Sequence, residues 1–401
     1  MDGRIPKQPK ILFLNQVAGP LFRELAEDVA GEIGDCVLLS GDGYDADWQA
    51  RPALHVIDAP RYDRSSLPRR ALSWVAYFLK ALFWAIRVPR RTTLFLVSNP
   101  PFLVAIGWLL KIFRGQRYVV LVYDVYPGLL VNLGRLREGG LVACLWSWFN
   151  QATWGNADMI ITIGDFMADS IRKMLPTNSA TPITVVPNWA DADFIRPQDK
   201  THNRFAQKIG HADKLTVMYS GNLGDTHDIR SVVEAARRFR GRPEVGFLII
   251  GEGAQRPGIE KMIREEQLDN VTLMSFQPEK ELPNTLTTGD VSVVTLAQGI
   301  EGFSVPSKTY YMMAAGAALL VISRGPNEMT EMVDRFRCGT AVEPGDVDGI
   351  CRAIEGYLSD PSQLRTARKN SRSAMEAHYS RANAQAYVRE LRPLVEEGAG
   401  A

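Results

Sequence analysis

The chain has 401 residues, which is too long for one ordinary hydrophobic core and suits two domains. A net charge of +1 excludes a general affinity for nucleic acid, and four scattered cysteines and five scattered histidines exclude a zinc site or a disulfide framework. Because the first residues also lack the pattern of a secretory signal, we expect a protein of the cytoplasm.

The first half alternates short apolar strands with helical segments, which is typical of a parallel α/β sheet. The predicted strands are, in chain order, 10–17, 36–41, 55–60, 93–101, 118–127, 159–165 and 183–191. Ligands bind beyond the carboxyl ends of such strands, which points to Asn15–Gly19, Ser98–Asn99, Asp124 and Asn188. Asp124 ends a very apolar strand, where a carboxylate is costly unless exposed or paired, so it is either a functional acid or a capping residue.

The segment 61–117 departs from the neutrality of the whole chain. It holds eleven lysines or arginines against one acid, and it encloses an apolar, aromatic run at 71–86. This run is shorter than the ~20 apolar residues that span a bilayer. Arginines flanking Trp and Phe are typical of a helix that lies in the membrane interface. The alternative is a pair of core helices with charged ends, and one helix can do both.

A polar segment, 191–214, separates this half from a second α/β half. Its predicted strands are 215–224, 245–251, 271–276, 291–296, 318–323 and 339–344, and a last amphipathic helix ends the chain. Two doubly wound domains that face each other imply a cleft between them.

Several motifs in the second half and nearby are weak when taken alone. Gly221, Asn222 and Gly224 lie between a strand and a helix start, where backbone N–H groups can meet a phosphate, although glycines are common at strand ends. The sequence GEGAQRPG lacks the third glycine of the dinucleotide fingerprint and is interpreted as a turn.

His227 is interpreted as a surface histidine rather than a phosphate ligand. The two Asp-x-Asp sequences, at 45–47 and 191–193, are interpreted as solvated loop acids rather than a metal site.

The stretch Glu301–Gly316, EGFSVPSKTYYMMAAG, is the most informative. Its first part is a loop, and a helix that begins at Lys308 and stops at Gly316 follows. A lysine at a helix start favours an anion such as phosphate. The alternative is an ordinary helix that packs through its Met and Ala residues.

In order, the segments YDVYP, VVPNWAD, YSGNLG, FLIIGEGAQRPGIE and VPSKTYYMMAAG resemble the retaining glycosyltransferases of family 4, in particular the bacterial branch that makes O-antigen, capsule or colanic acid. The resemblance covers nearly the whole chain. It implies the GT-B fold, with two Rossmann-like domains facing across a cleft. The expected domains are 1–192 on the acceptor side, 193–375 for the donor, and a final helix, 376–401, that packs back on the first domain.

The resemblance also implies a reaction and its residues. It implies metal-independent transfer of a sugar from a nucleotide diphosphate, with UDP favoured over GDP. The acceptor would be linked to a polyprenyl diphosphate at the inner face of the cytoplasmic membrane. No cofactor or metal is expected, and the oligomeric state stays open. Glu301, Lys308 and Asp124 are the expected catalytic residues, and the expected donor-binding residues are Gly19, Gly221, Asn222, Gly224, Gly302, Phe303, Ser304 and Tyr311.

One departure from the family leaves an alternative open. The second glutamate of its motif falls on Thr309 by spacing from Glu301, or on Tyr311 by counting back from Gly316, and neither is acidic. That glutamate usually holds the ribose, a task that would pass to Tyr311. Gly19 is also the only glycine in a loop where the family usually has a pair. A non-catalytic nucleotide-sugar-binding or scaffold protein of the same fold is therefore the alternative function.

Overall fold

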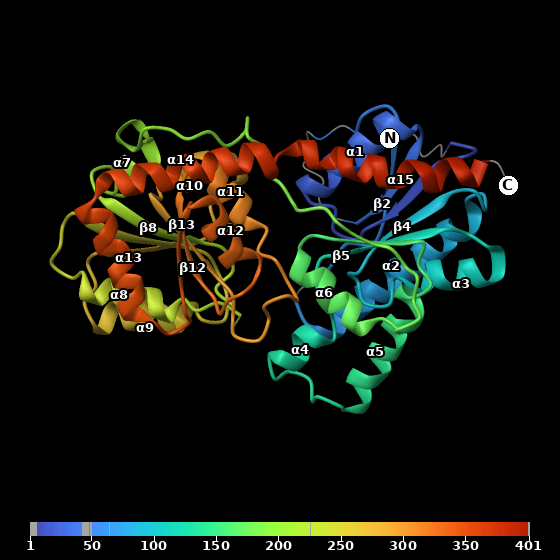
Figure 1. The fold of residues 1–401 in the computed structure, drawn as a ribbon, viewed down its shortest axis with the longest axis horizontal. Coiled ribbons are helices and arrows are strands. Elements are labelled where there is room, and N and C mark those ends of the chain that lie inside the picture. The colour runs from blue at the N-terminus through green and yellow to red at the C-terminus, as the bar shows by residue number, and fades with distance from the viewer. Residues whose placement is uncertain (1–5, 42–47, 49, 64, 225, 400–401) are drawn as a thin grey trace. The chain divides into compact units, whose positions relative to one another are not determined.

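The computed structural model describes residues 6–41, 48, 50–63, 65–224 and 226–399. The contacts divide the chain into two units (Figure 1). Unit 1 holds the described residues up to Val131, then Leu136–Pro187 and those from Arg381 onward; unit 2 holds Asn132–Arg135 and Asn188–Ser380.

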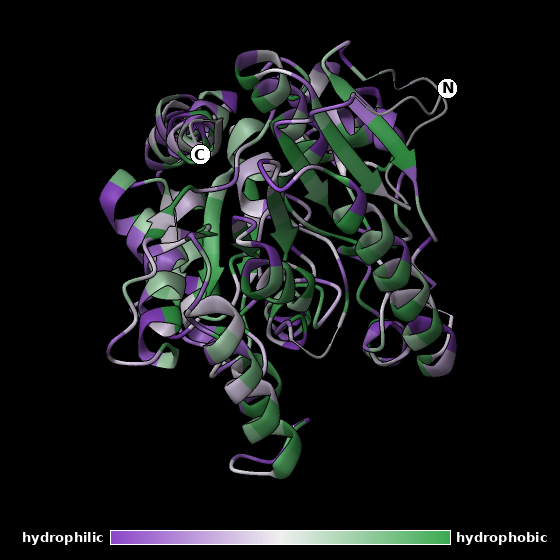
Figure 2. Ribbon diagram, turned by 90° about the vertical axis from the view of Figure 1, so that its right-hand side faces the viewer, coloured by the Kyte–Doolittle hydropathy of each residue, from purple (hydrophilic) through white to green (hydrophobic). Residues whose placement is uncertain are grey.

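Unit 1 is built on a parallel sheet in the order β3-β2-β1-β4-β5-β6-β7, which is the doubly wound arrangement predicted from the sequence. Its five inner strands are buried along their whole length, and this explains why the sequence shows them as continuous apolar runs (Figure 2). The two edge strands are only partly buried. The strands are β1 (Ile11–Leu14), β2 (Cys36–Ser40), β3 (Leu54–Asp58), β4 (Thr93–Val97), β5 (Tyr118–Val122), β6 (Met159–Thr162) and β7 (Ile183–Val185).

Helices flank this sheet: α1 (Pro20–Ile33), α2 (Leu67–Arg87), α3 (Ala105–Arg114), α4 (Gly128–Asn132), α5 (Leu141–Trp154), α6 (Asp165–Met174) and α15 (Ala384–Ala399). The last of these, α15, lies beside α1 (Figure 1). Arg381, just before α15, donates two hydrogen bonds of 2.8 Å to the carboxylate of Asp28 on α1. Tyr387 of α15 is fully buried. The end of the chain therefore belongs to the first unit.

Unit 2 contains a parallel sheet in the order β10-β9-β8-β11-β12-β13. Its strands are β8 (Leu215–Ser220), β9 (Val245–Ile250), β10 (Val271–Met274), β11 (Val291–Thr295), β12 (Ala318–Ile322) and β13 (Gly339–Val342). Its helices are α7 (Arg204–Lys208), α8 (Arg230–Arg238), α9 (Arg256–Glu265), α10 (Leu282–Leu286), α11 (Lys308–Ala314), α12 (Glu328–Phe336), α13 (Val347–Ser359) and α14 (Pro361–His378). Both halves thus have the predicted α/β architecture.

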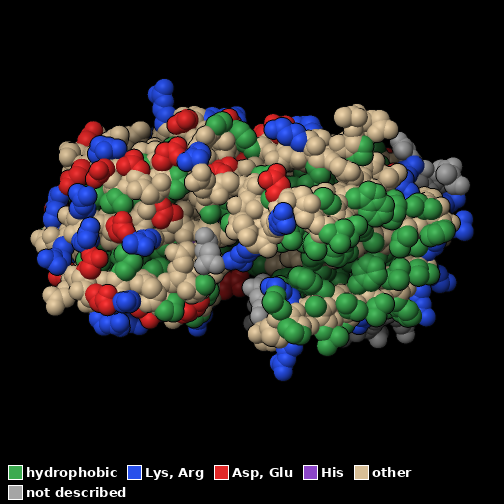
Figure 3. Space-filling model, turned by 90° about the horizontal axis from the view of Figure 1, so that it is seen from below, with side chains coloured by type: hydrophobic (Ala, Val, Ile, Leu, Met, Phe, Trp, Pro, Cys, Tyr) green, Lys and Arg blue, Asp and Glu red, His purple; other side chains and the backbone are tan. Residues whose placement is uncertain are grey.

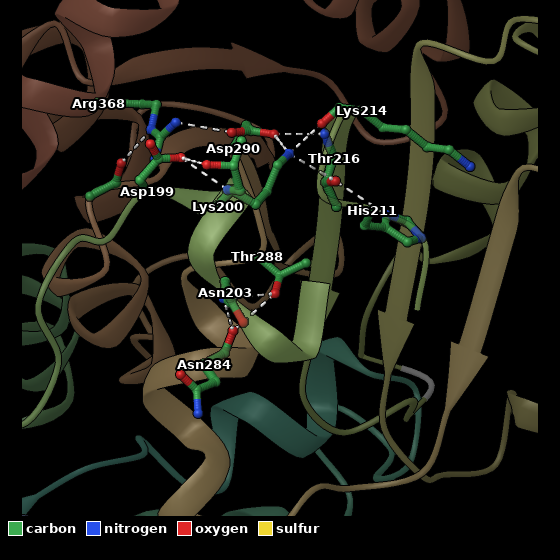
Figure 4. A network of polar contacts seen from close by, with 12 residues as sticks. Asp199, Lys200, Asn203, His211, Lys214, Thr216, Asn284, Thr288, Asp290 and Arg368 are labelled. Carbon is green, nitrogen blue, oxygen red and sulfur yellow. Dashed lines mark hydrogen bonds and ion pairs between the residues drawn. The ribbon is translucent and has the colours of Figure 1, made fainter. Parts of the chain in front are cut away.

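A buried network of polar side chains lies in unit 2 at the amino ends of β8 and β11 (Figure 4). Asp290, just before β11, pairs through one carboxylate oxygen with Lys200 and through the other with Arg368 of α14, at 2.9 Å. It also accepts a hydrogen bond of 2.9 Å from the backbone N–H of Thr216. The segment 191–214, predicted to separate the halves, is for this reason an integral part of unit 2.

Candidate functional site

The candidate site of unit 2 lies where the strand order reverses. Strands β8 and β11 are neighbours in the sheet although β9 and β10 separate them in the chain, so they form the topological switch point at which ligands of such sheets bind. Gly221 follows β8 directly, and the loop that leads to Lys308 follows β11. Both candidate phosphate-binding segments are therefore brought to the carboxyl ends of two adjacent strands.

Gly221 and Lys308 lie in direct proximity. The backbone of Gly221 has a φ of 155°, a conformation that residues with a side chain rarely adopt. A Cβ atom built on Gly221 would lie 3.0 Å from the Nζ atom of Lys308. Glycine is thus required here both by the backbone conformation and by the closeness of the lysine.

A second glycine turn packs against the first. Gly251 follows β9, and a Cβ atom on it would lie 1.9 Å from the carbonyl oxygen of Gly221. Gly221 donates its N–H to the carbonyl of Ile250 at 2.9 Å. The interpretation of GEGAQRPG as a turn is confirmed, and the structural role of the turn is to hold the loop that carries Gly221.

Asn222 and Gly224 complete the first turn. Asn222 is exposed, and its carbonyl accepts a hydrogen bond of 2.6 Å from the hydroxyl of Tyr219. A Cβ atom on Gly224 would lie 2.8 Å from the side-chain nitrogen of Asn222. The turn is therefore tight, and its shape depends on the tyrosine of the preceding strand.

The ammonium group of Lys308 is buried without a hydrogen-bond partner among the described residues. Although Lys308 as a whole residue is partly exposed, its Nζ atom is not. Nζ lies 3.9 Å from the centroid of the Tyr219 ring, a cation–π contact. Burial lowers the pKa of Lys308 to about 7. A buried cation with unused donors is an arrangement that an anionic ligand would complete.

The helix behind Lys308 contributes less than its sequence suggested. Helix α11 has only seven residues, and Gly316 follows it with a φ of 69°, which confirms the predicted stop. Because so short a helix has a small dipole, the lysine itself is the main source of positive charge at this position.

His227 borders the lysine and is partly buried, so its interpretation as a surface histidine is wrong. Its Nδ1 atom lies 3.0 Å from the carbonyl oxygen of Thr295, at the end of β11. Burial, and then the positive charge of Lys308, lower the pKa of His227 to about 4. The ring is neutral at pH 7, Nδ1 donates to the carbonyl, and Nε2 keeps a free lone pair.

Glu301 has one occupied and one free carboxylate oxygen. Its Oε2 atom accepts a hydrogen bond of 2.6 Å from the N–H of Gly299, while Oε1 is buried without a partner among the described residues. Gly302 follows with a φ of 78°, which makes the turn, and Phe303 and Ser304 continue it half-buried. A fixed carboxylate with a free oxygen can accept a hydrogen bond from a ligand hydroxyl.

The helix register decides between Thr309 and Tyr311 as the residue at the position of the family's second glutamate. Thr309 is fully buried, and its hydroxyl lies 3.3 Å from the sulfur of Met329. It therefore cannot reach a ligand. Tyr311 is half-buried on another side of α11, so it remains the candidate for the position of the family's second glutamate.

Unit 1 carries the two remaining predicted residues at the carboxyl ends of its strands. Gly19 precedes α1, just after β1, and no atom lies within 4 Å of a Cβ built on it. Asp124 follows β5 and is half-buried; burial first and its negative charge second raise the pKa of Tyr126 to about 12. The roles expected for Gly19 and Asp124 stay predictions.

Metal ligands are a separate question. Within the part of the chain that the structure describes, no three His, Cys, Asp or Glu side chains are grouped closely enough to hold a metal ion. The Asp-x-Asp sequence at 45–47 lies outside the described residues, and Asp191 accepts hydrogen bonds from the N–H groups of Asp193 and Phe194 in its own turn.

Two family models match the chain, one to each half. Residues 18–189 match the glycosyl transferase 4-like domain, and residues 200–374 match the glycosyl transferases of group 1. The chain belongs to the family 4 glycosyltransferases.

Relatives in sequence agree with this family. The chain is 26% identical over 341 residues to "Probable glycosyltransferase WbjE" of Pseudomonas aeruginosa, with 84% of each chain covered. It is 27% identical over 274 residues to WcaI of Escherichia coli, a glycosyl transferase named for colanic acid biosynthesis, with 67% of this chain and 66% of that one covered.

Solved structures share the GT-B fold. Sucrose-phosphate synthase from Thermosynechococcus elongatus has a TM-score of 0.76 at 20% identity and covers 97% of this chain and 100% of its own. Anabaena HepE in complex with UDP-glucose has a TM-score of 0.72 at 14% identity, with 95% and 98% covered.

The glycosyltransferase exposes an extensive apolar face on α2, α3 and α5 of unit 1 (Figure 3). Helix α3 lies against both α2 and α5. The exposed apolar residues are Leu67, Leu72, Val75, Leu79, Phe83 and Ile86 of α2, Leu109, Ile112 and Phe113 of α3, and Leu141, Val142, Leu145 and Trp148 of α5. Within the described residues, no helix is both long and apolar enough to cross a bilayer. The sequence predicted exposed aromatic residues in 61–117 but missed α5, whose continuous apolar run resembles a core helix.

Sequence reasoning also missed Tyr219. A tyrosine in an apolar strand normally packs in the core, and here its ring face covers the ammonium of Lys308 and its hydroxyl shapes the glycine turn. Its position, two residues before a glycine that follows a strand, was the only available signal.

Proposed function

We propose that this glycosyltransferase transfers a sugar from a nucleotide diphosphate, UDP in preference to GDP, with retention of configuration and without a metal ion. The observation that carries the proposal is the buried, unpartnered ammonium of Lys308 beside Gly221 at the switch point of unit 2. A diphosphate leaving group supplies the negative charge that this position lacks.

The charges of the reaction fit this position. As the bond to the sugar breaks, negative charge builds on an oxygen of the β-phosphate. Lys308 and the N–H groups of the glycine turn would stabilise that charge, and burial makes the interaction stronger than it would be in water. The free Oε1 atom of Glu301 would accept a hydrogen bond from a hydroxyl of the donor sugar, and Tyr311 would contact the ribose.

The preference for UDP is supported by a structural neighbour. HepE of Anabaena was solved with UDP-glucose, with UDP, and with UDP and glucose. We carry this ligand class to the present chain because the two proteins share the fold. Lys308 would supply the positive charge that faces the diphosphate.

For the acceptor, we propose a sugar linked to a polyprenyl diphosphate at the inner face of the cytoplasmic membrane, within the synthesis of a bacterial surface polysaccharide. The name of WcaI supports the pathway class, and the exposed apolar face of α2 and α3 supports a lipid surface. Asp124 would orient a hydroxyl of the acceptor or of the donor sugar.

The second candidate is a non-catalytic nucleotide-sugar-binding or scaffold protein, favoured by the tyrosine at position 311. A thermal-shift screen of UDP-, GDP- and ADP-sugars, followed by a transfer assay with the stabilising donor, separates the two. A ligand at a hundredfold excess over its Kd should stabilise the protein by about 2.7 kcal/mol. Stabilisation by a donor whose nucleotide is not released with any acceptor tested would favour the scaffold.

A further inference from the structure

Unit 1 contains a basic cavity at one end of its apolar face. The cavity has a volume of about 350 Å³ and is lined by Gln8, Pro9, Lys10, Pro89, Arg90, Arg91, Thr92 and Val395. Since a water molecule in the liquid takes about 30 Å³, the space holds roughly ten waters, enough for a phosphate group and its substituents. The residues that the structure describes around it include three cations and no acid.

These three cations have no competing partner in the described part of the chain. Lys10, Arg90 and Arg91 are exposed, and none of them forms an ion pair or side-chain hydrogen bond with another described residue. Arg87 differs, because its guanidinium lies 3.7 Å from the centroid of the Phe83 ring. The three cations of the cavity are thus available for an external anion.

The wall of the cavity is fixed by buried hydrogen bonds. The side chain of Gln116 donates to the carbonyl of Thr92 at 3.0 Å, and the hydroxyl of Thr92 donates to the carbonyl of Pro9 at 2.7 Å. Thr92 and Gln116 are both buried. The backbone that carries Arg90 and Arg91 is therefore held in place beside Lys10 before any ligand binds, which lowers the cost of binding.

The cavity lies near the C-terminal ends of α2 and α3. Residues 89–92 directly follow α2, whose last turn exposes Ile86. Arg114, at the end of α3, donates to the carbonyl of Ile86 at 2.8 Å and to that of Val88 at 3.1 Å. The neighbouring Phe113 has 76% of its surface exposed. Apolar side chains and a phosphate-sized basic cavity thus lie at the same end of the two helices, and Figure 3 shows Lys and Arg side chains at the margin of the apolar face.

We propose that Lys10, Arg90 and Arg91 form a binding site for the phosphate headgroup of an anionic phospholipid, whose acyl chains lie along the apolar face of α2 and α3. This inference rests on the membrane association in the proposed function and adds to it a specific lipid site. Apolar side chains alone fit any lipid, whereas three cations carried on a fixed backbone favour an anionic one.

The test uses the full chain and two variants that each lose three cations of unit 1. The cavity variant is Lys10→Ala/Arg90→Ala/Arg91→Ala, and the control is Arg69→Ala/Lys80→Ala/Arg87→Ala on α2. Calorimetric titration with dihexanoyl phosphatidylglycerol below its micelle concentration should show saturable binding in the wild type. We expect this binding to be lost in the cavity variant and to stay within about twofold in the control.

Vesicles and inorganic phosphate distinguish a lipid site from a general attraction of cations to anions. Both variants should lose affinity for vesicles of phosphatidylcholine with phosphatidylglycerol, about fivefold for each cation, and the cavity variant should lose a further tenfold. Equal losses in the two variants, or equal affinity for inorganic phosphate and the short-chain lipid, would overturn the lipid site. Short-chain lipid binding without vesicle binding would contradict the membrane association instead, while the UDP affinity of each variant reports separately on unit 2.

Discussion

The Nζ atom of Lys308 lies 3.9 Å above the Tyr219 ring, and no described residue accepts a hydrogen bond from it. The two residues come from different elements, β8 and α11, that meet at the switch point of unit 2. The free protein thus keeps a cation in a position that favours its neutral form. Such an arrangement destabilises the empty protein and is explained if a charged ligand completes it.

Replacing Lys308 with Met should separate activity from stability. We expect kcat/KM for sugar transfer to fall about 10²–10³-fold, because a donor aimed at the leaving phosphate is lost. The free energy of unfolding at pH 6 should rise by about 1–3 kcal/mol, because a buried unpaired charge is removed. Chemical denaturation and a transfer assay measure the two effects. A variant that is both less stable and fully active would contradict this account of Lys308.

Donor binding should take up a proton near pH 8. With a pKa of about 7, Lys308 is mostly neutral at pH 8 in the free protein, and a diphosphate beside it favours the charged form. Calorimetric titration of UDP in buffers of different ionisation enthalpy should show uptake approaching one proton at pH 8 and little at pH 6. In Lys308→Met the buffer dependence should vanish, and its persistence would assign the proton to another group.

The same shift predicts how stability changes with pH. The folded-state pKa of Lys308 lies below its ordinary value of 10.5, so between pH 7 and 10.5 the unfolded chain binds more protons than the folded one. This group's contribution to the free energy of unfolding therefore rises with pH across that window. The difference between wild type and Lys308→Met, measured by denaturation at several pH values, should shrink as the pH rises. A constant difference would show that the lysine is not perturbed.

Gly221→Ala should impair both folding and donor binding. Alanine is strained at a φ of 155°, and its Cβ atom would press on the lysine at 3.0 Å. We expect a loss of about 1–3 kcal/mol in stability and at least tenfold weaker UDP binding. Gly258→Ala is the control, because that glycine lies in α9 with no atom within 4 Å of a built Cβ. The control should be as stable as the wild type or about 0.5–1 kcal/mol more stable.

Asp290→Asn should destabilise unit 2 without a direct effect on the donor site. It removes the charge that Lys200 and Arg368 share, and breaking a buried ion pair in this way costs about 3–5 kcal/mol. Asp193→Asn, which breaks the exposed pair with Arg196, should leave the melting temperature unchanged. If both variants melt like the wild type, the network of Figure 4 does not hold the segment 191–214 in place.

The strands were predictable because parallel sheets bury both faces. Short, continuous apolar runs such as those at 93–97 and 118–122 are typical of strands buried on both faces, and each of them forms a strand. The sequence predicted doubly wound parallel sheets, but it did not predict the order of the strands within each sheet. The reversal between β8 and β11 depends on contacts between residues far apart in the chain, and local pattern does not encode these.

The sequence predicted which residues form the candidate site, but it did not predict how deeply they are buried or which side chains surround them. The motifs named Lys308, Gly221 and Glu301, while the burial of the ammonium depends on Tyr219, which no spacing rule connects to Lys308. The choice between Thr309 and Tyr311 likewise needed the register of α11. The segment 191–214 looked like a linker because it is polar, and the partner of its Lys200, Asp290, lies much later in the chain.

The affinity of UDP for wild type and for Lys308→Met, measured by calorimetry at pH 6.5, tests the central claim most directly. At this pH the lysine is mostly charged in the free protein, so its contribution to binding is not masked by deprotonation. The account predicts that UDP binds the wild type and binds the variant at least thirtyfold more weakly. Equal Kd values would show that the buried ammonium does not hold the diphosphate.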